Sequence, residues 1–166
     1  MTKTKVSGSF RDPSGFLFFQ NEQIFRQVNK YYEKNYDLLM DSGLYKNLVD
    51  KGLLVAHQEK EFSHFPELGN DMAVHKIIQP ERIKFISYPY EWCFSELKDA
   101  SLATLEIQKT ALEHDMSLKD ATAYNIQFKE GRPILIDTLS FEKYEEGRPW
   151  VAYKQFCQHF LAPLVL

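Results

Sequence analysis

Three polar residues stand at a spacing that suits phosphoryl-transfer chemistry. Asp120 is followed five positions later by Asn125, and a short strand, a tight turn and a second strand then lead to Asp137. Phosphoryl transfer uses one carboxylate to orient or deprotonate the attacking hydroxyl, while an amide oxygen and a second carboxylate hold Mg²⁺ against the phosphates. We predict that the loop places Asp120 and Asn125 side by side and that the hairpin folds Asp137 back over them.

Each of these residues also has a purely structural interpretation. Asp137 can cap the end of the hairpin by accepting hydrogen bonds from backbone amides near Thr138 and Leu139, and Asp120 can cap a short turn. Asn125 can adopt a left-handed turn conformation. The joint spacing of the three residues, rather than any one of them, is what favours the chemical interpretation.

The elements expected around these residues begin with short strands. Runs of β-branched and aromatic residues bounded by turn signals predict strands at 6–10, 16–20, 23–28, 53–57, 74–78 and 83–88. A turn over 11–15 and a tight reversal at Asn21-Glu22 join the first three into an antiparallel meander.

Helical spacing appears in three places. Apolar residues at three- and four-residue intervals predict a helix over 36–48, which Gly43 divides in two and Gly52 ends. A longer helix is predicted from Ser95 to about His114, and a last one from Pro149 through Phe160. Between the last two we expect a loop over 116–125 and a hairpin made of 126–128 and 133–137.

The stretch from Leu118 to Phe141 resembles the catalytic and metal-binding loops of protein kinases and small-molecule phosphotransferases. The resemblance implies that Asp120 is the catalytic base and that Asn125 and Asp137 are the metal ligands. Leu118 and the Thr138-Leu139 pair depart from the usual motifs of that family.

The same resemblance extends to the first half of the chain. It places Arg26 in the position of the phosphate-binding lysine, with Glu33 or Asp37 as the acid that pairs with it. It also places Tyr88-Pro89-Tyr90-Glu91 at the hinge, where Tyr90 is implied to bind the cofactor by stacking on it. Arg26 is not lysine, and the loop at 11–15 is not a glycine-rich phosphate cover.

A second resemblance covers nearly the whole chain. Three phrases, 15–28, 88–94 and 135–142, are similar to the N-terminal region of bacterial proteins catalogued as SAM-dependent methyltransferases. This resemblance implies a methyltransferase domain downstream. The seven glycines of the chain form no glycine-rich turn after a strand, so we expect the SAM site to lie outside these residues.

Cysteines and histidines show no pattern of a metal site. Cys93 is predicted to be buried and inert, and Cys157 to lie on a helix face as a free thiol. His57, His64 and His75 have no zinc-type spacing and are predicted to have surface or core roles. His114 is predicted to satisfy carbonyl groups at a helix end.

Bulk composition favours a globular protein without a membrane or nucleic-acid partner. The chain has 166 residues, 44% of them hydrophobic, and a net charge of −3. Such a balance lacks the basic footprint of nucleic-acid binding. No run reaches the length of a membrane span and no signal core is visible, which predicts a cytoplasmic location. The apolar end, 160–166, predicts that more protein follows; a tail docked on the core is the alternative.

These observations predict an α+β, kinase-like fold: an antiparallel small-lobe sheet, then helices, a catalytic-type loop and a β-hairpin. The chain is expected to be a single module, small-lobe-like over 1–90 and the start of a large lobe over 91–166. The leading hypothesis is an accessory or substrate-recognition module of a methyltransferase-type protein, with a cleft for Mg-ATP. Its expected partners are the methyltransferase domain of the same parent chain and a small-molecule or nucleotide ligand. The alternatives are an active ATP-dependent phosphotransferase with Asp120 as base, and a non-catalytic scaffold.

Overall fold

The computed structural model describes residues 4–5, 12–65 and 73–166. The chain separates into two compact units. Unit 1 consists of residues 1–37 and 56–82, and unit 2 of residues 38–55 and 83–166. The strand predicted at 6–10 lies outside the described residues.

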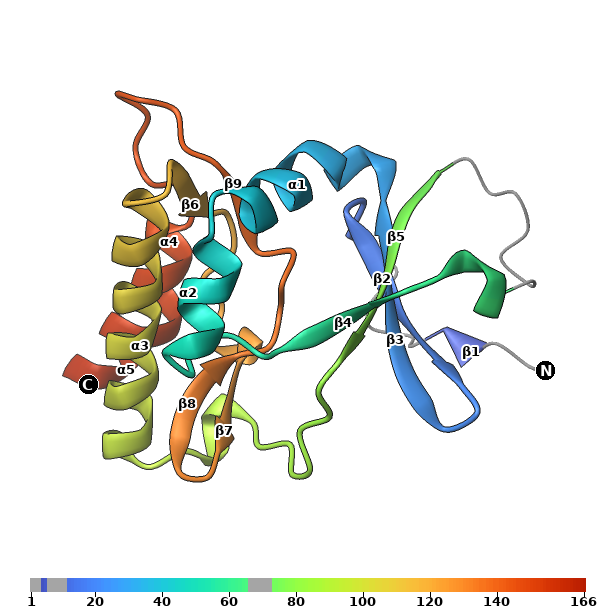
Figure 1. Ribbon diagram of the computed structural model, residues 1–166. Coiled ribbons are helices and arrows are strands. Elements are labelled where there is room, and N and C mark those ends of the chain that lie inside the picture. Colours follow the sequence, from blue (N-terminus) through green and yellow to red (C-terminus); the bar gives the residue numbers. More distant parts are fainter. Residues whose placement is uncertain (1–3, 6–11, 66–72) are drawn as a thin grey trace. The chain divides into compact units, whose positions relative to one another are not determined.

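Unit 1 is built on a five-stranded antiparallel sheet with the strand order β1-β2-β3-β5-β4, seen in blue and green in Figure 1. The strands are β1 (Thr4–Lys5), β2 (Gly15–Gln20), β3 (Gln23–Asn29), β4 (His57–Lys60) and β5 (Val74–Pro80). Short 3₁₀ segments, η1 (Lys30–Tyr32) and η2 (Phe62–His64), follow β3 and β4. The strands predicted at 16–20, 23–28 and 74–78 are confirmed.

Aromatic rings form the core of unit 1. Phe18, Phe25 and Phe65 contact one another, with ring centroids 5.0–5.9 Å apart, and Val74 and Ile77 complete the cluster. Pairs at these separations add to the hydrophobic burial that holds a sheet together. Three phenylalanine rings therefore form the centre of the core that packs against this sheet.

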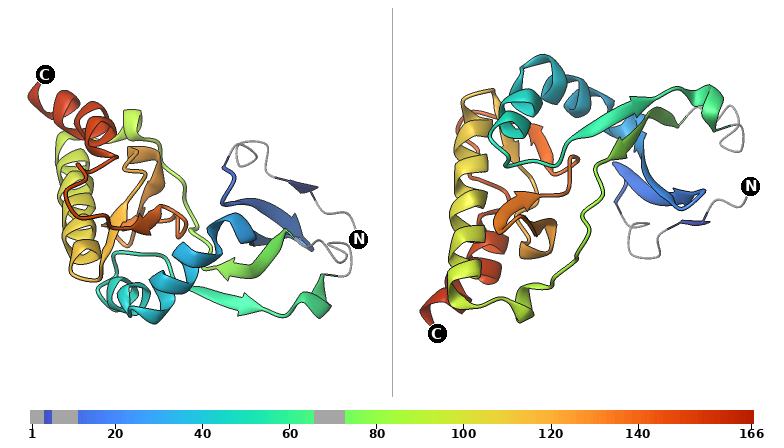
Figure 2. Two further views of the ribbon diagram at one scale, coloured as in Figure 1. Left: turned by 90° about the horizontal axis from the view of Figure 1, so that it is seen from above. Right: turned by 60° about the horizontal axis from the view of Figure 1, so that its bottom comes forward.

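Unit 2 is mostly helical. Its helical elements are α2 (Leu44–Asp50), η4 (Pro89–Glu91), α3 (Phe94–Leu112), η5 (Ala123–Asn125), α4 (Tyr153–Phe156), the π-helix η6 (Cys157–Leu161) and α5 (Ala162–Val165). Helix α1 (Glu33–Asp41) supplies its first residues to unit 1 and the rest to unit 2. Gly43, at a φ of 80°, separates α1 from α2 as predicted. In both views of Figure 2 the long helix α3 lies beside the C-terminal helical segments.

Two small antiparallel pairs complete unit 2. Strands β6 (Met116–Leu118) and β9 (Phe141–Lys143) pair with each other, and β7 (Ile126–Lys129) pairs with β8 (Arg132–Leu135). In the β7–β8 hairpin, Glu130 and Gly131 both have positive φ, which is the type I′ geometry that matches strand twist. The predicted hairpin is confirmed, while the predicted loop at 116–125 begins as a strand.

Two predicted strands are wrong. Over 53–56 the chain is not a strand: Leu54 and Val55 are buried within unit 2, and the Val55 amide donates to the Leu135 carbonyl at 2.9 Å. The strand of this region is β4, which begins at His57. Residues 83–88 contain no strand either, and Phe85 is 76% exposed. The alternating apolar residues of 83–88 therefore do not form the buried face of a strand.

The last helix begins later than predicted. Helix α4 starts at Tyr153 rather than at Pro149. The Trp150 indole donates to the Leu118 carbonyl at 2.8 Å, and this contact is made before the helix begins. Trp150 is thus bonded to Leu118 outside the helix, three residues before its first residue.

The two tight hairpin turns carry Glu22 and Gly131 at their second central position, and this difference yields a stability prediction. Gly131→Ala places a side chain at a φ of 76° and is expected to lower the free energy of unfolding by about 1 kcal/mol. Glu22→Gly relieves a non-glycine residue at a φ of 62° in the β2–β3 turn and is expected to raise it by roughly 0.5 kcal/mol. Urea unfolding of both variants measures the two effects. Equal losses at both turns would contradict the backbone explanation.

Candidate functional site

The chain segments that carry the three residues predicted from the loop spacing are joined at Ser140 in unit 2. The Lys119 amide, next to Asp120, donates to the Ser140 carbonyl at 2.8 Å. Asn125 Nδ2 donates to Ser140 Oγ at 3.2 Å, and the Ser140 amide lies 3.3 Å from the Asp137 carbonyl. The segments that carry Asp120, Asn125 and Asp137 are therefore joined by hydrogen bonds to one buried serine.

Strand pairing explains this convergence. Leu118, the last residue of β6, is paired with Phe141, the first residue of β9, so the loop after β6 starts beside the segment that precedes β9. Ile126 is likewise paired with Leu135 at the open end of the β7–β8 hairpin. The Ile136 amide then donates to the Asn125 carbonyl at 2.8 Å.

Both carboxylates of this group accept backbone amides. Asp120 Oδ1 accepts from the Thr122 amide at 3.0 Å, and Asp137 Oδ1 accepts from the Leu139 amide at 2.9 Å. These are the turn caps of the structural interpretation. A carboxylate has about four acceptor sites, so it can accept a backbone amide and bind a cation at the same time. Asp120, Asn125 and Asp137 are all half-buried, in contact with solvent.

Asn125 ends the 3₁₀ segment η5, and its predicted left-handed conformation is wrong. Among the described non-glycine residues, positive φ occurs at Asn21, Glu22, Asp115 and Glu130. The amide side chain is instead oriented by its bond to Ser140.

Residues from the C-terminal helical segments hold the loop in place, and sequence reasoning missed them. Gln155 Oε1 accepts from the Ala121 amide at 2.6 Å, and His159 Nδ1 lies 3.2 Å from Thr122 Oγ1. His159 belongs to the π-helix η6, a form often found at functional sites. The available signal was a pair of polar residues four apart, Gln155 and His159, each followed by a phenylalanine.

Tyr90 lies in the same unit as the loop. It is 75% exposed, and its ring is stacked on that of Tyr88 with centroids 5.5 Å apart and planes 2° apart. Local desolvation, then Glu91, Tyr88 and Tyr124, raise the pKa of Tyr90 above its ordinary value. Tyr124, which belongs to the candidate loop, is exposed as well.

Arg26 belongs to unit 1, in strand β3. Its guanidinium is almost buried and lies 3.4 Å from Asp12 Oδ2, while Asp12 Oδ1 accepts from the Ser14 amide at 2.8 Å. The acid that the structure places against Arg26 is thus Asp12, whereas Glu33 and Asp37 contact His75.

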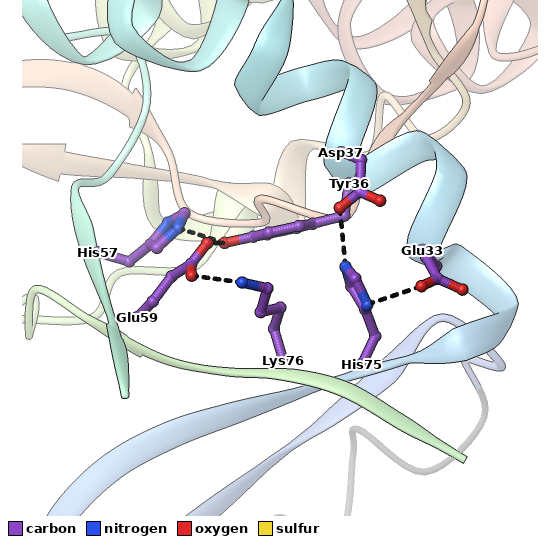
Figure 3. A network of polar contacts seen from close by, with 7 residues as sticks. All are labelled: Glu33, Tyr36, Asp37, His57, Glu59, His75 and Lys76. Carbon is purple, nitrogen blue, oxygen red and sulfur yellow. Dashed lines mark hydrogen bonds and ion pairs between the residues drawn. The ribbon is translucent and has the colours of Figure 1, made fainter. Parts of the chain in front are cut away.

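A polar network in unit 1 surrounds the hydroxyl of Tyr36, whose residue is buried (Figure 3). The hydroxyl donates to Glu59 Oε1 at 3.0 Å and lies 3.0 Å from His57 Nε2. Since its one hydrogen is directed at Glu59, the hydroxyl accepts from His57 as the Nε2–H tautomer. Lys76 Nζ donates to Glu59 Oε2 at 2.8 Å and completes the chain.

Burial and charge pairing shift the pKa values in this network. Burial lowers the pKa of His57 from 6.5 to about 4, against the opposing effect of Glu59. Burial alone raises the pKa of Glu59, but hydrogen bonds from Lys76 and Tyr36 outweigh it and bring that pKa below its ordinary value. The hydrogen bond to Glu59 raises the pKa of Lys76. At neutral pH the network therefore contains a neutral imidazole beside a carboxylate–ammonium pair.

Three further predictions, for Cys93, Cys157 and His114, can be compared with the structure. Cys93 is exposed, so its predicted burial is wrong; it lies at the N-cap of α3 rather than inside the aromatic run. Cys157 is half-buried on a helical segment. His114 Nδ1 lies 2.9 Å from the Thr110 carbonyl, which confirms its predicted helix-end role.

The chain was compared with known proteins. No model of a protein family matches it. It is similar to the nodulation protein NoeA of Rhizobium meliloti (strain 1021), with 39% identity over 162 residues. The match covers 98% of this chain and 33% of the relative, so the chain spans about a third of the length of that protein. In the part of the chain that the structure describes, every helix is too short or too polar to cross a membrane.

The lowered pKa of His57 predicts a pH dependence of stability. Because burial lowers the pKa of His57 in the folded state, the unfolded chain binds the proton at a higher pH than the folded chain does. The contribution of His57 is therefore fully present above pH 6.5 and is lost as pH falls towards about 4. We expect a loss of about 3 kcal/mol over this range, and Glu59 adds a loss only below its ordinary pKa. Urea unfolding of the wild type and of His57→Gln at pH 4.5–7.5 measures the difference, and parallel curves would contradict the prediction.

Proposed function

We propose that this chain is an accessory, substrate-recognition module at the N-terminus of a bacterial protein of the SAM-dependent methyltransferase type. We further propose that its Asp120–Asn125–Asp137 group binds a Mg-nucleotide. The observation that supports the proposal is the hydrogen bonding at Ser140 of the three segments that carry these residues. The lobe assignment of 1–90 and 91–166 stays a prediction within this proposal.

The chemistry of the group supports a magnesium ion. Mg²⁺ prefers oxygen ligands and binds through one or two carboxylates together with substrate phosphates. Asp120 and Asp137 supply two carboxylates, and the amide oxygen of Asn125 supplies a neutral third ligand. The hydrogen bonds at Ser140 restrain all three segments in advance, which lowers the ordering cost of binding.

An exposed aromatic group supports a nucleotide rather than a bare phosphate. The rings of Tyr88 and Tyr90 are stacked and exposed in the same unit as the candidate loop, and Tyr124 is exposed within that loop. Planar rings at a solvent-facing edge bind a base by stacking. In this proposal they receive the base of the nucleotide, and the magnesium ligands receive its phosphates.

The accessory role is supported by the length of the relative and by an apolar stripe on α3. Because the chain spans a third of the relative, we propose that the remainder of a longer chain is its partner. Leu102, Leu105 and Leu112 are exposed at three- and seven-residue spacing on one side of α3. We propose that the methyltransferase part of the parent covers this stripe.

The scaffold alternative also has an observation in its favour, namely the backbone amides bound by Asp120 and Asp137. A scaffold needs those carboxyl groups only as hydrogen-bond acceptors, whereas a magnesium site needs their charge. An active phosphotransferase uses the same three residues and adds Asp120 as the base. Replacing aspartate by asparagine separates the scaffold from the other two.

The magnesium proposal predicts a ligand-dependent stabilisation. Mg-ATP is expected to raise the Tm of the wild type in a saturable way. Asp137→Asn keeps an oxygen to accept the Leu139 amide but loses the charge, so its Tm without ligand is expected to change little while the Mg-ATP shift is lost. Differential scanning fluorimetry measures both values.

The matched control is Asp99→Asn, which changes an exposed aspartate on α3 and is expected to keep the full shift. An unchanged Mg-ATP shift in Asp137→Asn would exclude the assigned ligands. No shift in the wild type at millimolar Mg-ATP would favour the scaffold.

The module proposal also predicts the response to SAM. This chain lacks a glycine-rich turn after a strand, so SAM is expected to leave its Tm unchanged. Isothermal titration with SAM is an independent measurement. Saturable SAM binding by the 166-residue chain would contradict the placement of the SAM site in the rest of the parent.

A further inference from the structure

A second group of possible metal ligands lies in unit 1, away from the residues used above. Glu33 and Asp37 are one helical turn apart on α1, and His75 faces them from β5 (Figure 3). His75 Nδ1 lies 3.2 Å from Glu33 Oε1, and His75 Nε2 lies 2.8 Å from Asp37 Oδ1. One ligand atom from each of the three residues lies within 4.8 Å of the other two.

We propose that Glu33, Asp37 and His75 form a binding site for a divalent transition-metal ion of the Zn²⁺ type. Imidazole nitrogen favours zinc and its neighbours over Mg²⁺ and Ca²⁺, and Zn²⁺ accepts carboxylate oxygen in the same shell. Three protein ligands leave a further position for water. The donor set therefore selects a different ion from the all-oxygen group of unit 2.

The distances suit an ion of this size. With Zn–N and Zn–O bonds of about 2.1 Å, two ligand atoms on a tetrahedral ion are about 3.3 Å apart. The separation between His75 Nδ1 and Glu33 Oε1 is already 3.2 Å. Asp37 Oδ1 lies 2.8 Å from the other ring nitrogen, Nε2, so Asp37 has to change its rotamer to join Glu33 on one ion. One ligand atom from each of the three residues lies within 4.8 Å of the others.

The surroundings orient the histidine and leave the acids accessible. The His75 side chain is only 12% exposed, and its ring meets that of Tyr36 edge-on with centroids 5.9 Å apart. The side chains of Glu33 and Asp37 are 46% and 48% exposed, so a hydrated ion can reach them. A rigid nitrogen ligand beside two solvent-facing carboxylates is a preformed entry point for a cation.

Local charge also favours a cation. With a neutral imidazole the three ligands carry two negative charges, and the nearby Lys76 ammonium is bound to Glu59. A bound ion would fasten the first turns of α1 to β5, where the two ion pairs of His75 act now. The competing account is that a protonated His75 bridges both carboxylates as a simple salt-bridge clamp.

The test is titration of the intact chain with ZnCl₂, followed by isothermal calorimetry and by thermal unfolding. We expect saturable binding of one Zn²⁺ per chain at this site and a rise in Tm. His75→Ala and Glu33→Gln are each expected to weaken Zn²⁺ binding by about tenfold or more, because even partners outside the ligand shell contribute 10–100-fold.

Two controls make the result specific. His64→Ala removes an exposed imidazole that lines a different hollow with Gln20 and Phe65, and it is expected to keep full Zn²⁺ affinity. Asp137→Asn is also expected to keep it, so failure of the magnesium proposal and failure of the zinc proposal can be told apart.

The salt-bridge clamp predicts a different pattern. It predicts that His75→Ala lowers the Tm without metal and that Zn²⁺ produces no site-specific shift in any variant. Zn²⁺ binding that is unchanged in both His75→Ala and Glu33→Gln, or absent from the wild type, would overturn the proposal.

Discussion

Two short antiparallel pairings hold the candidate site of unit 2 together. The β6–β9 pair joins Leu118 to Phe141, and the β7–β8 pair joins Ile126 to Leu135. All four side chains are buried, so the register of each pair is set by hydrophobic burial, and a slip of one residue would turn these side chains to the opposite face. Every geometric relation among Asp120, Asn125 and Asp137 follows from these two registers.

The residues between the strands show how polar groups are used inside that frame. Thr138, Leu139 and Ser140 are buried, and Ser140 bonds to both flanking segments. A buried serine without partners would destabilise the fold, so its hydrogen bonds serve stability and positioning together. The C-terminal helical segments add a second restraint through Gln155 and His159. The loop is thus supported from two sides, as a binding site built on loops requires.

Unit 1 combines an apolar aromatic core with a buried polar network. Its aromatic core is apolar, but its contact with α1 is made by a chain of polar groups around Tyr36 and His75. A buried neutral histidine and a carboxylate–ammonium pair are compatible there because each polar atom that Tyr36 presents has a partner. Unlike the aromatic core, this network contains a histidine whose pKa is lowered by burial to about 4, so its protonation state changes in the acid range.

The sequence by itself determined the local elements and the chemistry of the loop residues. The positive-φ turns, the division of the helix at Gly43 and the β7–β8 hairpin are encoded by neighbouring residues, because turn and helix signals act over a few positions. The α+β class and the antiparallel sheet were predictable for the same reason. The spacing of Asp120, Asn125 and Asp137 also indicated which chain segments lie next to one another, whereas their joint role as ligands stays a prediction.

Only the tertiary structure decided what depends on long-range burial. Leu54 and Val55 have the composition of a strand, yet they are buried against Leu135, so the strand begins at His57. Ser140, Gln155 and His159 acquire their roles from partners 15 to 37 positions away. The grouping of Glu33, Asp37 and His75 likewise requires a helix to lie against a strand 38 positions later. Such contacts are set by packing between elements, which local sequence patterns do not specify.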